Sequence, residues 1–214
     1  MIAVITGDII ASRKLKDQSV WLNPLKELFN EWGETPKDWE VLAGDYFKVE
    51  VAEPENALLY ALKIKAMIRS VSARQPSNTK SEIDVRMVIG IGNKDYAADR
   101  ISESNGSAFV NSGEKFEKLK KEKNTLSVNS GNSDFDDSMN LYLKFAQRVM
   151  DNWSVSSAEL MTATLNNPNK NQSEIGQLLG IKQPSVSGRN HRAQIEEILE
   201  VEKFYRKAVS SLKP

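Results

Sequence analysis

Two glycine-aspartate pairs stand at the ends of apolar segments. Gly7 and Asp8 follow aliphatic residues near the N-terminus, and Gly44 and Asp45 separate two further apolar segments. If the two strands are neighbours, both carboxylates lie at one edge of a sheet, where they offer the oxygen ligands that Mg²⁺ or Mn²⁺ takes together with phosphates. We therefore predict metal ligation by Asp8 and Asp45, and phosphate contacts from Gly7, Gly44 and Arg13. The alternative is that Asp8 caps the next helix and Gly44-Asp45 makes a simple hairpin turn.

A second motif covers residues 171–193 near the C-terminus. Ile175 and Leu178 have the spacing of a buried helix face, Gly180 permits a left-handed turn, and Pro184 suits the first turn of the next helix. This spacing is typical of a helix-turn-helix. We expect double-stranded DNA to contact polar side chains of the second helix, namely Gln183, Ser185, Ser187, Arg189 and Arg192. The alternative is a helical module that only packs against the sheet domain or a partner.

The elements that position these residues follow from hydrophobic periodicity. Strand patterns are expected at residues 2–10, 39–43, 46–51 and 83–92, and helical patterns at 21–32 and 57–68, with a loop at 76–78. The order strand, helix, hairpin, helix, strand predicts a ferredoxin-like antiparallel sheet with helices on one face. Further along we expect a helix at 108–119, a strand at 125–129 and a helix at 141–153.

These patterns divide the chain into an α+β domain at residues 1–130 and an all-α helical region at 131–214. Apolar residues at helical intervals over 195–212 fit either a dimerisation helix, and hence a homodimer, or a helix that closes the chain's own core.

Composition limits the classes of protein. The 214 residues carry 29 basic and 29 acidic side chains, so DNA contact needs a local basic patch. Residues 163–193 supply one, because this segment contains four Lys or Arg residues and only one Glu. The absence of cysteine fits a reducing compartment. We see no apolar run of membrane-spanning length and no signal peptide, so we expect a cytoplasmic protein without membrane contact.

The motifs around Asp8 and Asp45 resemble the two metal-aspartate motifs of class III nucleotidyl cyclases. The segment from Gly106 to Glu117 is similar to the cyclase segment in which an Asn and, four residues later, an Arg stabilise the transition state. The resemblance assigns these roles to Asn111 and Lys115 if the site is active, and it implies a nucleotide bound with Mg²⁺ or Mn²⁺. The base-reading Lys and Asp of that family fall on Val41 and Ser104.

The chain as a whole resembles the SatD family of bacterial proteins, and its C-terminal part resembles helix-turn-helix DNA-binding domains. The first resemblance implies a two-part architecture and a loose association with stress tolerance and DNA binding. The leading hypothesis is a DNA-binding transcription regulator whose cyclase-like domain senses a nucleotide or metal. The alternatives are a metal-dependent nucleotidyl-transfer enzyme and a protein-interaction adaptor.

Overall fold

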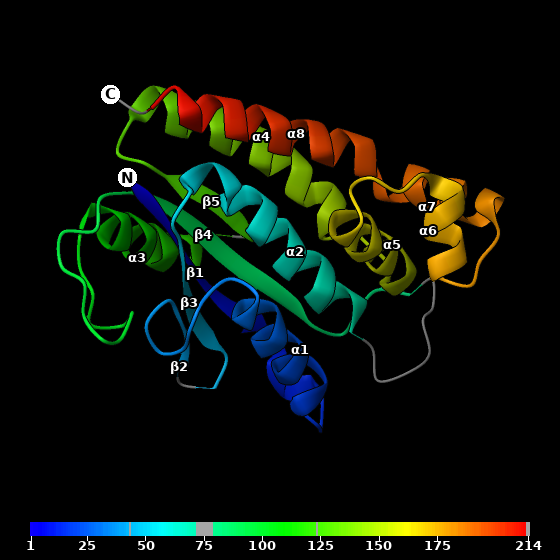
Figure 1. The fold of residues 1–214 in the computed structure, drawn as a ribbon, viewed down its shortest axis with the longest axis horizontal. Helices are drawn as coiled ribbons and strands as arrows, with labels where there is room; N and C mark the ends of the chain where they lie inside the picture. Colours follow the sequence, from blue (N-terminus) through cyan, green and yellow to red (C-terminus); the bar gives the residue numbers. More distant parts are fainter. Residues whose placement is uncertain (43, 72–78, 123, 213–214) are drawn as a thin grey trace.

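The fold is described from a computed structural model for residues 1–42, 44–71, 79–122 and 124–212. Over these residues the chain is α+β, with a mixed five-stranded sheet and helices (Figure 1). The strands are β1 (Ile2–Ile10), β2 (Trp39–Leu42), β3 (Tyr46–Val51), β4 (Asp84–Gly92) and β5 (Leu126–Asn129).

The helices of the first half are α1 (Ser19–Asn30), α2 (Ala57–Ser70) and α3 (Ser107–Leu119), with short 3-10 helices η1 (Ser12–Lys14) and η2 (Pro54–Asn56). The second half contains α4 (Ser133–Met150), α5 (Val155–Asn166), α6 (Gln172–Leu178), α7 (Gln183–Ala193) and α8 (Ile195–Ser210). Each expected strand and helix is present, to within a few residues at most ends. The expected loop at 76–78 and residue 43, the expected end of a strand, lie outside the described residues.

The strand order is β2-β3-β1-β4-β5. The first three neighbouring pairs are antiparallel, whereas β4 and β5 are parallel. The prediction of a wholly antiparallel sheet is therefore wrong at this edge. The reason is the connection: α3 carries the chain back along the sheet before β5 begins, so β5 runs in the same direction as β4.

Both faces of the sheet are apolar, and helices cover both. Ile5 and Ile9 of β1 belong to the core cluster that includes residues of α1 and α2, whereas Val4 packs with Phe109 of α3 on the other face. α3 lies very close to the sheet, since a Cβ on Gly90 would be 2.3 Å from the Ser112 backbone nitrogen. The prediction that helices cover only one face is thus wrong, because alternate residues of β1 are apolar on both sides.

The main core continues across residue 130, the expected domain boundary. It includes side chains of the sheet together with Phe135 of α4 and Ile198, Tyr205 and Val209 of α8. The Tyr205 hydroxyl donates a hydrogen bond to the Pro54 carbonyl over 3.0 Å. Most of the apolar side chains at residues 195–212 therefore lie in the chain's own core, as one of the two alternatives predicted.

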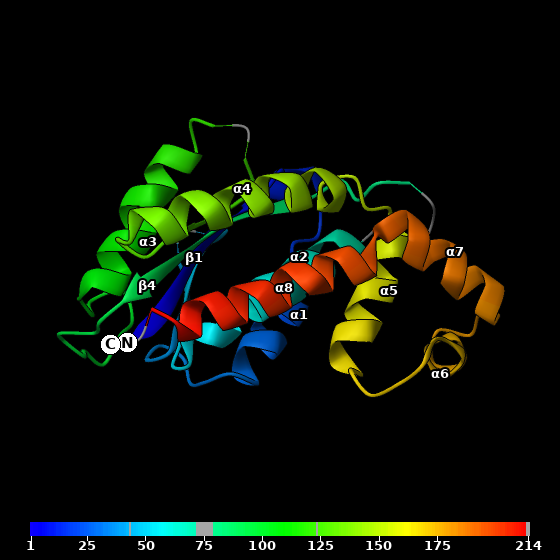
Figure 2. The same cartoon turned by 90° about the horizontal axis from the view of Figure 1, so that it is seen from above.

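Helix α5 has no counterpart among the sequence-based expectations. Its buried residues lie on several sides and include the small residues Ser156, Ser157 and Ala158, so no single apolar face marks it in the sequence. It packs against α2 on one side and α7 on another, and Figure 2 shows it between α2 and the pair α6 and α7. This helix therefore attaches α6 and α7 to the rest of the molecule.

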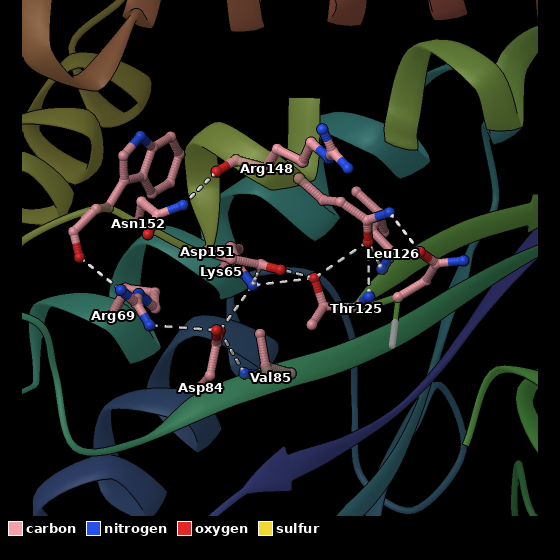
Figure 3. Close-up of polar contacts among 12 residues, drawn as sticks. Lys65, Arg69, Asp84, Val85, Thr125, Leu126, Arg148, Asp151 and Asn152 are labelled. Atoms are coloured by element: carbon pink, nitrogen blue, oxygen red, sulfur yellow. Dashed lines mark hydrogen bonds and ion pairs between the residues drawn. The ribbon is translucent and has the colours of Figure 1, made fainter. Parts of the chain in front are cut away.

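A buried polar cluster joins α2, β4 and the segment after α4 (Figure 3). We call Lys65, Arg69, Asp84, Thr125 and Asp151 the lysine network. The Lys65 Nζ lies 2.7 Å from Asp84 Oδ1 and 2.6 Å from Asp151 Oδ1, and Arg69 Nη1 lies 3.2 Å from Asp84 Oδ2. Thr125 Oγ1 donates to Asp151 over 2.7 Å. Each carboxylate of the network thus has a cationic partner.

Among the described helices, none combines the length and the apolar character that crossing a bilayer requires.

Candidate functional site

The fold places Asp8 and Asp45 side by side. Asp8 lies near the C-terminal end of β1 in register with Tyr46, the residue after Asp45. The Ile9 backbone N–H donates to the Asp45 carbonyl over 3.1 Å. Because β3 is the neighbour of β1, the turn that carries Asp45 meets the strand that carries Asp8. We call Asp8, Ser12, Asp45 and Arg86 the aspartate site.

The Asp8 carboxylate is only partly compensated. Its Oδ1 is buried and has no hydrogen-bond partner among the described residues, and the Arg86 Nε lies 3.9 Å away, beyond hydrogen-bond distance. Burial raises the pKa of the Asp8 carboxyl above its ordinary value of 3.8; Arg86 lowers this pKa and the charge of Asp45 raises it again. Asp8 Oδ1 is thus a buried carboxylate oxygen without a hydrogen-bond donor in the described part of the chain, next to a second carboxylate. A bound cation would stabilise the charged form of both groups.

Asp45 is held from the other side by η1. The buried Ser12 hydroxyl donates to Asp45 Oδ2 over 2.7 Å. Gly44, which precedes Asp45, has a φ of 89°, a conformation that glycine adopts without strain. The tight turn and the serine together fix the carboxylate beside β1.

The two carboxylates of the aspartate site match the number of protein ligands that Mg²⁺ usually has. Mg²⁺ is held by one or two carboxylates, and waters or phosphates complete its octahedron. No group of three or more His, Cys, Asp or Glu side chains suited to a metal occurs in the part of the chain that the structure describes. Asp8 and Asp45 would therefore hold the ion only together with ligands from outside the protein.

Of the three residues expected to contact phosphate, one is buried in the sheet and two are exposed near the aspartate site. Gly7 is a buried residue of the central strand, in register with Phe47 and Met87, so it does not lie in a phosphate-binding loop. A Cβ at Gly7 would be 2.4 Å from Phe47 Cζ, which explains the glycine by packing. Gly44 and Arg13 are exposed near the aspartate site, in the β2–β3 turn and in η1.

Three side chains near Asp8 were not expected from the sequence. Arg86 faces Asp8 across the β1–β4 pair, and the C-terminal end of α3 brings Glu117 and Lys120 close enough to influence the Asp8 pKa. Lys120 forms an ion pair with Glu117 over 2.7 Å and also lies over the Phe116 ring. The alternation of polar residues in β4 hinted at Arg86, but only the strand register assigns its partner.

Asn111 and Lys115 lie elsewhere in this chain. The Asn111 side-chain amide donates to the Ile91 carbonyl over 2.8 Å, at the end of β4 remote from Arg86. Ile91 lies five positions after Arg86 along the strand, which corresponds to roughly 16 Å. Lys115 lines a hollow between α3, α4 and β5. Burial raises the pKa of the nearby Asp136 carboxyl, and the charge of Lys115 is one of the contributions that oppose this rise. A single chain therefore does not bring these two residues to Asp8 and Asp45.

The α6–α7 unit lies at one end of the molecule, beside α5 (Figures 1 and 2). Asn171 and Glu174 form a reciprocal capping box at the start of α6. Gly180 has a φ of 65° in the turn, and the Ile181 N–H donates to the Gly176 carbonyl over 2.9 Å. Val186 is buried between the helices. The two helices and the left-handed turn expected at residues 171–193 are present.

The expected DNA-contacting residues of α7 fall into two groups. Gln183, Ser185 and Ser187 are exposed, as is Arg192. Arg189, by contrast, is directed inward: its Nη1 lies 2.9 Å from Glu159 Oε2 of α5, and its side chain is 17% exposed. The expectation that Arg189 faces outward is wrong, because α5, which the sequence did not reveal, packs against this side of α7.

No protein-family profile, no curated protein and no solved structure matches this chain.

Proposed function

We propose that this chain is a DNA-binding regulatory protein in which the α6–α7 unit is a helix-turn-helix. The observation that carries the proposal is that Gln183, Ser185 and Ser187 are all exposed in the N-terminal half of α7, while Val186 between them is buried against α6. The N-terminal part of a recognition helix contacts base edges in known complexes of this kind. Lys182 and Arg192 are exposed at the two ends of α7 and would contact phosphates.

The sheet region is proposed as the sensor part of the protein, binding Mg²⁺ or Mn²⁺ together with a nucleotide. The support is the unpartnered Asp8 Oδ1 beside Asp45, because phosphate oxygens and an ion would supply the missing ligands. Arg13, exposed on η1, is placed to attract the phosphates. In the bound state the ion would neutralise two adjacent carboxylates and anchor the phosphates.

The first four strands and their helices are proposed to form a ferredoxin-like unit of the nucleotidyl cyclase kind. The order β2-β3-β1-β4 with antiparallel pairs, and the crossings through α1 and α2, support this assignment. Nucleotidyl transfer has weaker support, since Asn111 hydrogen-bonds to the strand end that is remote from Asp8.

Salt-dependent duplex binding tests the proposal. Mixed-sequence and promoter-derived duplexes are titrated with the full chain by fluorescence anisotropy at several salt concentrations. Replacing Lys182 and Arg192 together by Ala removes two phosphate contacts, so the slope of log K against log salt should fall by about 2.

The matched control replaces Lys26 and Lys37, exposed cations of the α1 region, by Ala. This variant should bind like the wild type. Gln183→Ala should reduce discrimination between duplexes while leaving the salt slope unchanged, since base contacts specify and phosphate contacts position. The proposal is overturned if the wild type does not bind the duplexes. It is also overturned if the control substitutions weaken binding as much as the substitutions of Lys182 and Arg192.

A further inference from the structure

Helix α4 exposes apolar side chains that the other described residues do not cover. Leu141 is 55% exposed and Phe145 63%, although both lie in the middle of a long helix whose opposite face belongs to the core. Tyr142 and Phe204, 46% exposed each, extend this surface onto α8 through a ring contact at 5.1 Å. Figures 1 and 2 show α4 and α8 running side by side along the outside of the molecule.

The charges on the exposed face of α4 are ordered along the helix. Asp134 and Asp137 lie in its N-terminal half, and Lys144 and Arg148 in its C-terminal half; all four side chains are exposed. None of the four forms an ion pair with another described residue. The helix dipole favours this order of charges, but it does not account for Leu141 and Phe145 in water between them.

This pattern is self-complementary. If a second α4 lies antiparallel to the first with Leu141 at the centre, Asp134 faces Arg148 of the other copy, and Asp137 lies near Lys144. The twofold axis repeats both pairs, so one helix contact forms four ion pairs around an apolar centre of Leu141 and Phe145. A parallel arrangement in register would oppose like charges instead. A closed dimer requires such a surface, one that matches itself after a twofold rotation.

We infer that α4, with the neighbouring aromatic side chains of α8, is the surface on which two copies of this chain form an antiparallel, twofold-symmetric dimer. We call Asp134, Asp137, Leu141, Lys144, Phe145 and Arg148 the α4 patch. The surface lies outside both the aspartate site and α7. The inference therefore does not depend on DNA or nucleotide binding, and a dimer would carry two copies of the α6–α7 unit.

The test uses charge reversal and mixing. One variant carries Asp134→Lys and Asp137→Lys, and the other Lys144→Glu and Arg148→Glu. Each alone places like charges opposite one another and should raise the dimer dissociation constant by at least about tenfold in sedimentation velocity. When the two are mixed, every contact again pairs opposite charges. The mixture should form a heterodimer with roughly the affinity of the wild type.

The control variant carries Lys26→Glu and Lys37→Glu, a charge change of equal size on the side of the molecule opposite α4. It should dimerise like the wild type. Circular dichroism and thermal melts check that each reversed variant is folded, and recovery in the mixture excludes misfolding as the cause of dissociation. A wild type that is monomeric at all concentrations, or a mixture that does not recover, overturns the inference.

Discussion

Two carboxylate clusters in this chain differ in how their negative charges are compensated. In the lysine network, Asp84 and Asp151 share the ammonium group of Lys65, and Arg69 and Thr125 add further contacts. In the aspartate site, two carboxylates are adjacent, yet within the part of the chain that the structure describes Asp8 Oδ1 accepts no hydrogen bond, and the Arg86 Nε is 3.9 Å away.

We use this difference to distinguish carboxylates that stabilise the fold from carboxylates proposed to bind a ligand. A buried ion pair with close partners on three segments fixes those segments relative to one another, and no external ligand is required. A half-buried carboxylate beside another carboxylate lacks that compensation, and a cation from solution would stabilise its charged form. By this criterion the lysine network holds α2, β4 and the end of α4 together, while the aspartate site is where we propose that a ligand binds.

The largest expected effect comes from breaking the lysine network. Lys65→Met keeps much of the side-chain volume but leaves Asp84 and Asp151 without their shared cation. Loss of one partner of a buried ion pair costs about 3–5 kcal/mol. We expect a decrease of that order in the free energy of unfolding measured with urea. Lys63→Met is the matched control and should change stability little, because Lys63 is on the same helix but forms no ion pair with another described residue. If Lys65→Met is as stable as Lys63→Met, the lysine network does not stabilise the fold as proposed.

The second prediction concerns the cation. Mn²⁺ or Mg²⁺ with a nucleoside triphosphate should raise the melting temperature of the wild type, because a ligand of the folded state alone stabilises it by about 2.7 kcal/mol at a hundredfold excess over its dissociation constant. Asp8→Asn and Asp45→Asn should lose this gain while remaining folded. Asp84→Asn serves as the contrasting variant: we expect it to be less stable but to keep the ligand-dependent shift. A shift that survives both substitutions at the aspartate site would place the ligand elsewhere.

The smallest effect is a pH dependence of the aspartate site. The pKa of Asp8 is raised in the folded state, so its charged form destabilises the fold above that pKa. This cost disappears as the pH falls through the folded pKa toward the ordinary value of 3.8. In cation-free buffer, Asp8→Asn should therefore be more stable than the wild type at neutral pH, and the difference should shrink on acidification. Urea unfolding of the pair at several pH values measures it; a difference that grows instead would contradict the pKa assignment.

Local patterns predicted much of the fold. Alternation and helical spacing marked the five strands, as well as α1, α2 and α3, because burial imposes a period of two or 3.6 on each segment independently. The turn at Gly180 followed from local backbone preference in the same way. The start of α4 was missed, since only Phe135 and Met139 are apolar among its first eight residues, and α5 was missed because several of its sides are buried.

The candidate sites were less predictable because partners come from distant segments. The proximity of Asp8 and Asp45 was expected from two strand ends, and β1–β3 pairing provides it. The pairing of Arg189 with Glu159 was not foreseeable, as it depends on the packing of α7 against α5. Lys65 and Arg69 left a signal, two cations four residues apart in an otherwise apolar helix, but not the identity of their acidic partners.

The sequence alone determined which side chains are present at each strand end, where the turn at Gly180 lies, and how charges are ordered along α4, since these depend on neighbours along the chain. Tertiary structure decided that Arg86 stands 3.9 Å from Asp8, that Arg189 faces inward, and that α3 covers the second face of the sheet. The physical reason is that strand register and helix packing are set by burial summed over the whole core, and residues far apart in sequence contribute to that sum together.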